Sequence, residues 1–376
     1  RMNKKSTSGL LRALELVQPA FLSGFTFPQW IRLLNENRWD IDAKYLPRAF
    51  IATAGTIATS FLKPFEPVAK LDEDGEKLWR RPVFILGLPR SGTTYLFNLL
   101  AQDPQFAYPA RIDSYNPHTL LLLRKLGLHQ LLAKLPAKKR FMDNIRTGWL
   151  SPEEDNVALT VLTGAGSRLI QVFNRNEKYR AGFSPSGRMS AQQRVLFTAA
   201  ISSFSKKLVF LHRARPLFKC PIHTRHIAEI LDTFPDAKFL TIFRNPFSQF
   251  ASLKAMHHSV SKDWSALQKG RILSDDTRLA SISSILKSYM ETRALIPQGH
   301  LCEIQYSELV RQQEACIQKF YSALDFGTPP DRTFQAAKEA YQKNSHPPLD
   351  SELQSRIRSV YEPFVKAGLF DPADLA

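Results

Sequence analysis

A short apolar run that enters a glycine-rich turn constrains the fold of this chain more than any other feature. Residues 84–95 read FILGLPRSGTTY, in which Gly87, Pro89 and Gly92 follow a strand-like run and a helical pattern comes next. In α/β proteins a strand, a glycine-rich turn and a helix hold phosphate groups, because backbone N–H groups and the helix N-terminus converge on an anion. The segment therefore predicts a phosphate-binding loop.

Strand-like and helical patterns alternate along the rest of the chain. Helical patterns follow at 94–100 and near 227–234, and another begins with Ser307 as its cap and runs toward Leu324 and Gly327. Such alternation predicts an α/β fold with a mainly parallel sheet that helices cover on both faces. The predicted strands are 82–88, 216–220, 238–243 and 301–306.

The first part of the chain has a different texture. Residues 1–80 look helical and end in a polar stretch at 70–81, which we interpret as a linker or turn. We therefore expect an N-terminal helical extension or cap at 1–80 and a main domain at 81–376.

Two apolar segments fall short of the roughly 20 residues that a bilayer-spanning helix needs. Residues 49–62 read AFIATAGTIATSFL, and residues 119–140 repeat leucine at helical spacing with basic residues between. For the first we favour a buried helix, and for the second a core stripe under a solvated face. The alternative is an apolar element that lines an acceptor pocket or rests on a membrane.

Charge and cysteine content narrow the partners and the compartment. Lys and Arg number 51 against 34 Asp and Glu, and the net charge of +17 suits a nucleotide, a nucleic acid or an acidic membrane surface. Cys220, Cys302 and Cys316 are irregularly spaced, so neither a disulfide framework nor a zinc site is indicated. With no export signal recognised, we expect a cytoplasmic protein, with peripheral membrane contact as an option.

The loop departs from that of nucleoside triphosphatases. Gly87 and Gly92 have the spacing of GxxxxGK[ST], but Thr93 stands where those enzymes need lysine. Arg90 lies inside the loop instead and offers a planar donor for two oxygens at once. Ordinary ATP or GTP hydrolysis is therefore disfavoured, although a P-loop kinase or NTPase stays the alternative.

Two motifs together carry a family resemblance. PRSGTT at 89–94 resembles the 5′-phosphosulfate loop of the sulfotransferases, whose donor is 3′-phosphoadenosine 5′-phosphosulfate (PAPS), and RNPFSQFAS at 244–252 resembles their 3′-phosphate site. Segments around Lys219 and Tyr306 also look like family segments, so the resemblance covers roughly residues 80–330. It is closest to the bacterial branch, near the tyrosylprotein and carbohydrate sulfotransferases.

The resemblance implies roles for individual residues and needs no metal. Lys219 matches a lysine near the bridging oxygen between phosphate and sulfate, and Tyr95 and Tyr306 match positions near adenine, with core packing as the equal alternative for both tyrosines. Arg244 and Ser252 match the 3′-phosphate pair. The residues that match the 5′-phosphosulfate loop are Arg90, Ser91, Gly92, Thr93 and Thr94.

The general base is open at this point, because the glutamate that the tyrosylprotein branch has about twenty residues after the loop has no counterpart here. Asp113 is the nearest acid, His118 has a pKa better matched to the task, and Glu154 is a third candidate. Each has a structural alternative, such as capping a helix.

The resemblance implies sulfuryl transfer to a hydroxyl or, as a weaker option, an amine. Leucine and phenylalanine in residues 10–65 and 115–135 favour an apolar or amphipathic acceptor, such as a sterol or lipid alcohol, over a carbohydrate or peptide. A noncatalytic nucleic-acid binder would explain the charge, but no aromatic and basic RNA signature is present, so we expect no nucleic-acid partner. The oligomeric state is open.

Overall fold

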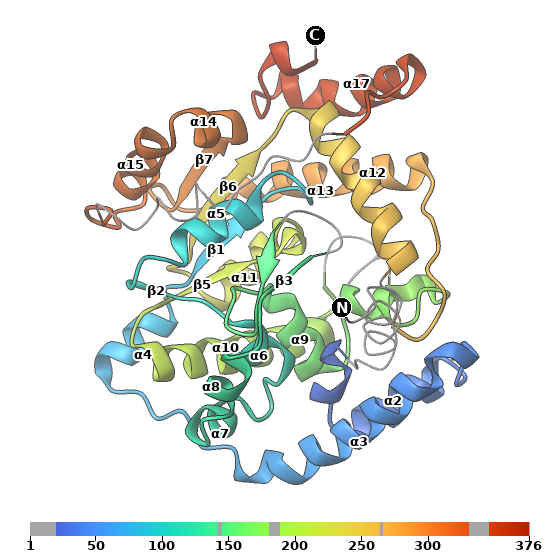
Figure 1. Ribbon diagram of the computed structural model, residues 1–376. Helices are drawn as coiled ribbons and strands as arrows, with labels where there is room; N and C mark the ends of the chain where they lie inside the picture. Colours follow the sequence, from blue (N-terminus) through green and yellow to red (C-terminus); the bar gives the residue numbers. More distant parts are fainter. Residues whose placement is uncertain (1–19, 141–144, 180–188, 264–265, 331–345, 376) are drawn as a thin grey trace, which may run out of the picture.

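Five parallel strands form the centre of the computed structural model, of which we describe residues 20–140, 145–179, 189–263, 266–330 and 346–375 (Figure 1). Their order is β2-β5-β1-β6-β7, and every neighbouring pair is parallel. The mainly parallel α/β fold is thus confirmed, and of these five strands only the two-residue edge strand β2 was not predicted from the sequence. The strands are β1 (Val83–Leu86), β2 (Phe106–Ala107), β5 (Arg215–Lys219), β6 (Lys238–Phe243) and β7 (Leu301–Gln305).

Side chains of β1 alternate between two hydrophobic clusters, because successive residues of a strand point to opposite faces. Phe84 and Leu86 join one cluster, whereas Val83 and Ile85 join the other. All four are buried, so both faces of the sheet are covered. The first cluster draws on α4 (Glu73–Trp79), α10 (Ala191–His212), α11 (Ile227–Thr233), α12 (Pro246–Asp263), α13 (Asp275–Thr292) and α17 (Ser351–Lys366), and the second on α5 (Thr93–Leu100), α14 (Tyr306–Arg311) and α15 (Gln313–Ala323).

A third cluster joins the N-terminal helices to the rest of the molecule. Trp30 and Leu33 of α2 and Ala52 of α3 pack with Val157 and Val161 of α9. The expected N-terminal helical extension is present, while the division at residue 80 stays a prediction. The elements concerned are η1 (Ala20–Gly24), α2 (Phe27–Glu36), α3 (Leu46–Leu62) and α9 (Asp155–Thr163).

Several local expectations were wrong. The stretch 70–81 contains helix α4 and is not a linker. Asp72 caps the N-terminus of this helix, because its side chain accepts a hydrogen bond from Gly75 N at 2.9 Å. The helix expected with Ser307 as its cap begins two residues earlier, with Gln305 as its N-cap, and it breaks at Gln312 between α14 and α15.

Residues 119–140 also differ from expectation. They form two short helices, α7 (Leu120–Lys125) and α8 (Leu128–Ala133), followed by β3 (Lys138–Lys139), which pairs with β4 (Arg146–Thr147). Leu120 and Leu121 are buried, but no residue of α8 is. The core stripe therefore stops with α7.

Helix α10 is the one helix in the described part of the chain that is long and apolar enough to cross a membrane by length and composition. Its Phe197, Phe204 and Leu208 are buried in the main core cluster. A core helix passes the same test, so the finding is weak evidence for a membrane span.

The sheet brings distant segments together at the carboxyl ends of its strands. In parallel strands the carboxyl ends meet on the same side, and ligands bind there. β1 lies between β5 and β6. The loop after β1, Lys219 at the end of β5 and Arg244 just after β6 are therefore neighbours (Figure 1).

Candidate active site

The loop after β1 has a backbone that only particular residues tolerate. Gly87 and Gly92 have φ values of 143° and 104°, and Arg90 adopts a left-handed φ of 71°. A Cβ on Gly92 would lie 2.5 Å from the Tyr306 ring, so any side chain there would displace the tyrosine. Thr93 then begins helix α5, whose free backbone N–H groups face the turn.

Hydrogen bonds from side chains hold this loop in place. Ser91 Oγ donates to Leu88 O at 2.8 Å, and Gln249 Nε2 donates to Pro89 O at 2.6 Å. The Gln249 carbonyl in turn accepts from the buried Tyr361 hydroxyl at 3.0 Å. Gln249 lies inside the RNPFSQFAS motif, but nothing in the sequence marked it as a support for the loop.

The two sequence motifs meet at Arg90. Arg90 Nε donates to Ser252 Oγ at 3.0 Å, and Arg244 Nη1 donates to the Arg90 carbonyl at 3.0 Å. The Arg244 guanidinium also lies 4.6 Å from the centre of the Tyr306 ring. Asn245 caps α12, since its Oδ1 accepts from Ser248 N at 3.0 Å. Two guanidinium groups and a hydroxyl are thus gathered at the end of β6.

His346 belongs to the same surroundings, although the sequence gave no motif for it. Its Nε2 is buried and has no hydrogen-bond partner among the residues described. Burial lowers the pKa of His346, and the charges of Arg90 and Arg244 lower it further. An anion bound to the two arginines would reverse that effect and offer the imidazole a partner.

Lys219 occupies the centre of a second group, which we call the Lys219 cluster: Thr94, Glu154, Arg168 and Lys219. Lys219 is 2% exposed, and its Nζ donates to Glu154 Oε1 at 2.6 Å and to Thr94 Oγ1 at 3.2 Å. Arg168 donates to the other oxygen of Glu154. Because an ammonium has three protons, one remains for a ligand beside Thr94.

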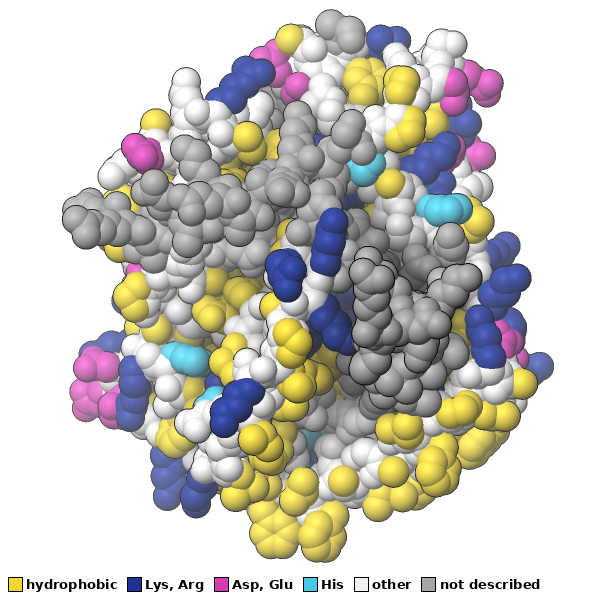
Figure 2. Space-filling view, in the orientation of Figure 1, with side chains coloured by type: hydrophobic (Ala, Val, Ile, Leu, Met, Phe, Trp, Pro, Cys, Tyr) yellow, Lys and Arg dark blue, Asp and Glu magenta, His cyan; other side chains and the backbone are white. Residues whose placement is uncertain are grey.

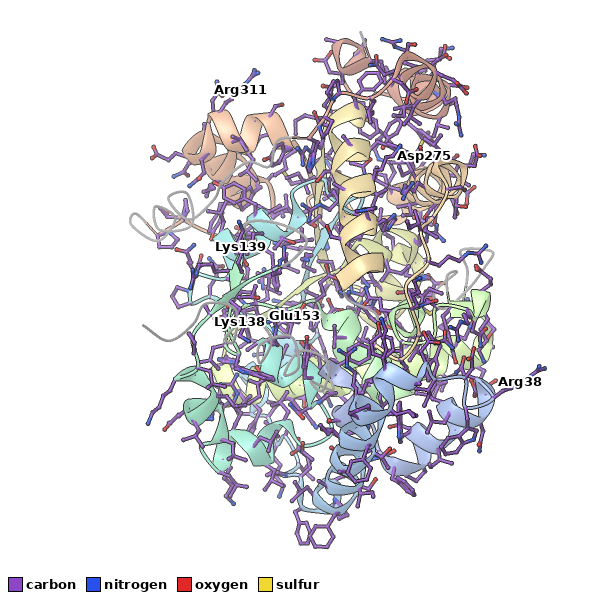
Figure 3. All side chains as sticks on the ribbon, turned by 45° about the vertical axis from the view of Figure 1, so that its right-hand side comes forward. Arg38, Lys138, Lys139, Glu153, Asp275 and Arg311 are labelled. Carbon is purple, nitrogen blue, oxygen red and sulfur yellow. The ribbon has the colours of Figure 1, made fainter. Side chains whose placement is uncertain are left out.

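The ionised form of Glu154 is strongly stabilised in this cluster. Burial alone would raise the pKa of Glu154, but the charges of Lys219 and Arg168 outweigh it and lower the pKa to about 2. Arg140, which follows β3, lowers it further. Figure 2 shows Lys and Arg side chains over the middle of this face, and Figure 3 labels Lys138, Lys139 and Glu153 there.

A buried carboxylate fixes the end of β5. Asp155 is fully buried, and its Oδ1 accepts from Lys219 N at 3.1 Å while its Oδ2 contacts His223 Nε2 at 2.5 Å. This carboxylate orients the backbone from which the Lys219 side chain projects. Neither Asp155 nor His223 was singled out from the sequence, although Asp155 directly follows Glu154.

Other candidates have different partners. Asp113 accepts from Arg124 at 2.9 and 2.6 Å and from Ala110 N at 3.1 Å. His118 Nε2 lies 3.2 Å from Gln29 Oε1, and burial is the main reason that the pKa of His118 falls to about 4.

The two candidate adenine contacts also differ in their surroundings. Tyr95 is buried in the core cluster on the α5 side of the sheet, and its hydroxyl donates to Gln313 Oε1 at 2.6 Å. Tyr306 is buried in the same cluster and also lies against Gly92 and Arg244. Tyr306 therefore borders the cationic group, and the adenine role of either tyrosine stays a prediction.

The arrangement suits a ligand with anionic groups at two places. Arg90, Arg244 and Ser252 offer donors at one end, and the N-terminus of α5 with Lys219 offers them at the other. Buried and preorganised cations stabilise charge that develops during a group transfer. In the described ranges, no group of three or more His, Cys, Asp and Glu side chains could hold a metal ion.

Comparison with known proteins gives a consistent answer. The model of the sulfotransferase family matches residues 82–330. Curated relatives named omega-hydroxy-beta-dihydromenaquinone-9 sulfotransferase Stf3, from Mycobacterium bovis and Mycobacterium tuberculosis, are each 25% identical over 349 residues. The match covers 91% of this chain and 89% of each relative.

Two solved structures share the fold. Sulfotransferase STF1 from Mycobacterium tuberculosis superposes with a TM-score of 0.56 at 16% identity, covering 90% of this chain and 92% of that one. Sulfotransferase STF9 from Mycobacterium avium gives 0.57 at 15% identity, covering 93% and 97%. Both matches cover more of this chain than residues 82–330.

Proposed function

This chain belongs to the sulfotransferase family, and we propose that it transfers the sulfuryl group of PAPS to the hydroxyl of an apolar or amphipathic alcohol. The observation that carries the proposal is the meeting of Arg90, Arg244 and Ser252 beside the glycine-rich loop. An ordinary nucleoside triphosphate has no 3′-phosphate for such a group. The residue roles below are part of the same proposal.

The donor would lie along the carboxyl edge of the sheet. Its 5′-phosphosulfate fits the loop and the first turn of α5, where Gly92 to Thr94 supply backbone N–H groups. Its 3′-phosphate fits Arg244 and Ser252, with His346 beside them. The Tyr306 ring, which already stacks under Arg244, is available to the adenine.

Lys219 would stabilise the leaving group. As the bond between sulfur and the bridging oxygen breaks, negative charge grows on that oxygen, and a buried ammonium responds strongly to it. Thr94 positions the ammonium from the start of α5, and Asp155 fixes its backbone. Arg90 supports the same charge from within the loop.

Glu154 would receive the proton of the acceptor hydroxyl. It shares Lys219 Nζ with the leaving oxygen, so a proton acceptor and a charge stabiliser are 2.6 Å apart. As Lys219 turns toward the leaving oxygen, its ion pair with Glu154 weakens, and the pKa of the Glu154 carboxylate rises. Asp113 and His118 are engaged with Arg124 and Gln29 instead.

The acceptor class is inferred from the surface and from the relatives. The curated relatives carry an omega-hydroxylated dihydromenaquinone in their names, which is a lipid with an alcohol group. In this chain α9, which begins beside Glu154, packs on the apolar N-terminal helices, and α3 exposes large apolar side chains. These features support a hydroxylated lipid more than a carbohydrate or a peptide.

The test is a transfer assay with isotopically labelled PAPS and acceptor mixtures of graded polarity, read by mass spectrometry. We expect label in a hydroxylated lipid fraction, and its loss in Lys219→Met. Label in a sugar or a tyrosine peptide alone would overturn the acceptor class but leave the donor assignment intact. Magnesium-dependent release of ADP from ATP would overturn the donor assignment.

A further inference from the structure

Helix α3 buries small or polar side chains and exposes large apolar ones, which is the reverse of an ordinary surface helix. Its buried face consists of small or polar residues such as Ala52, Thr56 and Thr59. Its large apolar side chains lie outside, with Phe50 77%, Ile57 52% and Phe61 71% exposed. These three residues are seven and four positions apart, so they form one stripe along the solvent face.

The stripe continues beyond the end of α3. Phe65, in η3 (Lys63–Phe65), is 62% exposed, and its ring lies 6.0 Å from that of Phe61. Glu66, just after it, accepts from the backbone N–H groups of Leu121 and Leu122 at 3.0 and 2.9 Å. The end of α3 is therefore tied to the start of α7.

Exposed leucines and lysines occupy α7 and α8. Leu126, Leu131 and Leu135 are 61%, 63% and 51% exposed, next to the exposed Lys125 and Lys134. Figure 2 shows apolar side chains along the lower edge of the molecule, where Figure 1 has α3, α7 and α8. We call this surface the α3–α8 edge.

The charge of the α3–α8 edge has one sign. Residues 114–142 contain six Lys or Arg and no Asp or Glu, but Arg124 is paired with Asp113 and the last three lie in or just after β3. Lys125 and Lys134 therefore carry the charge next to α7 and α8. In residues 43–71 the only acid is Glu66, whose charge is paired with Lys207 Nζ at 2.7 Å. Lys63 and Lys70 are exposed.

We propose that the α3–α8 edge binds the surface of an anionic lipid bilayer. Large apolar side chains would enter the boundary between headgroups and acyl chains, and the lysines would meet lipid phosphates at headgroup depth. This combination of an apolar stripe and basic flanks is what an interfacial helix uses. The inference goes beyond the transfer reaction, because it needs neither donor nor acceptor.

A bilayer fits this edge better than a second copy of the chain. A two-fold interface would bring the same patch of both copies together, so the lysines of one copy would share the interface with those of the other. Like charges so placed repel each other. A bilayer with anionic headgroups turns the same lysines into favourable contacts.

Sedimentation with lipid vesicles tests the proposal on the full chain without substrates. We expect the protein to sediment with phosphatidylglycerol vesicles and far less with phosphatidylcholine vesicles, and high salt to weaken binding. The double variant Phe50→Ser/Phe61→Ser should lower the partition coefficient about tenfold or more, because two exposed phenyl groups no longer enter the lipid. Lys63→Gln/Lys125→Gln should weaken binding to the anionic vesicles and leave the phosphatidylcholine value unchanged.

Matched variants keep the test specific. Leu295→Ser/Val310→Ser removes two exposed apolar side chains elsewhere, and Arg311→Gln removes a charge from α14, at the far end of the molecule from α3 (Figure 3). Both should bind vesicles like the wild type. The proposal would be overturned if the wild-type protein did not bind anionic vesicles. It would also be overturned if sedimentation without lipid showed a dimer that the Phe50→Ser/Phe61→Ser variant cannot form.

Discussion

Arg90 Nε donates a hydrogen bond to Ser252 Oγ across 3.0 Å, although 162 positions separate the two residues in the sequence. The contact joins the loop after β1 to helix α12 and brings Ser252 beside Arg90 and Arg244, where we propose that a second phosphate binds. Arg90 keeps a left-handed φ of 71° in doing so, a conformation that costs free energy for a residue with a Cβ. The proposed use of a donor with two separate phosphate positions depends on this pairing.

Arg244→Ala should remove most of the preference for a 3′-phosphate. Loss of one charge-assisted contact costs about 1.5–3 kcal/mol, which is roughly ten- to a hundredfold in affinity. Calorimetry with 3′-phosphoadenosine 5′-phosphate should record that loss, whereas affinity for AMP should change little. Arg311→Ala serves as a control for net charge. Equal losses for both nucleotides in Arg244→Ala would show that Arg244 supports the fold and does not read the 3′-phosphate.

Lys219→Met should lower kcat by about a hundredfold or more and raise the KM for the donor much less. The methionine keeps the buried stem but removes the charge, and the interaction with the leaving oxygen strengthens only in the transition state. Steady-state kinetics with saturating acceptor measures both constants. An unchanged kcat would make Lys219 a structural residue.

Glu154→Gln should reduce kcat about a hundredfold while donor binding persists, since the amide oxygen still accepts from Lys219. Glu153→Gln is the matched control, because the carboxylate of Glu153, the adjacent residue, pairs with Arg111 at 3.0 Å and not with Lys219. The kcat/KM for the donor, which reports the donor-free protein, should show no acidic limb from Glu154 near pH 6–7, because the pKa of Glu154 is lowered to about 2. An acidic limb near pH 4 that disappears in His118→Gln would assign the base to His118.

Protonation of His118 should contribute to the loss of stability in acid. Its pKa is about 4 in the folded chain against 6.5 for a free histidine, mainly because of burial. The unfolded state therefore binds more protons between these values, so stability is highest above pH 6.5 and falls toward pH 4, by about 3 kcal/mol at most. Denaturant unfolding of His118→Gln should show a flatter dependence on pH. An unchanged slope would place the acid sensitivity elsewhere.

Affinity for 3′-phosphoadenosine 5′-phosphate should depend on the protonation of His346. Burial and the two arginines lower its pKa in the free protein, and a bound phosphate raises it, so binding takes up a proton. The extra affinity is fully present below the free pKa and is lost as the pH rises through the bound pKa. His346→Gln should remove this component, measured as the difference between the two calorimetric pH profiles. Superimposable profiles would exclude His346 from the site.

Local sequence sufficed for four of the five central strands, the loop and the cationic pair. Gly87 and Gly92 needed their positive φ, and Arg244 followed a strand, so chain order alone placed these residues at one edge of the sheet. The helix at 73–79 was missed because its signal is a short polar capping pattern at Asp72. The apolar segments were assigned to the core because periodicity cannot tell which face of a helix is inward, and in α3 the large side chains point out.

The support of the site depends on contacts that no pattern encodes. Arg168 reaches Glu154 from a short helix after α9, and Gln249 reaches the loop across the sheet edge. Asp113 looked like a base because it lies about twenty residues after the loop, but Arg124, eleven positions later, engages it. Only the folded chain shows which carboxylate lies beside Lys219.

The central claim is that one site holds a nucleotide with both a 5′-phosphate and a 3′-phosphate. The most direct test is isothermal calorimetry of the wild-type protein with 3′-phosphoadenosine 5′-phosphate and with AMP under identical salt and pH. We predict that the bisphosphate binds at least about tenfold more tightly, because it alone meets Arg244 and Ser252. Equal affinities for the two nucleotides would contradict the account.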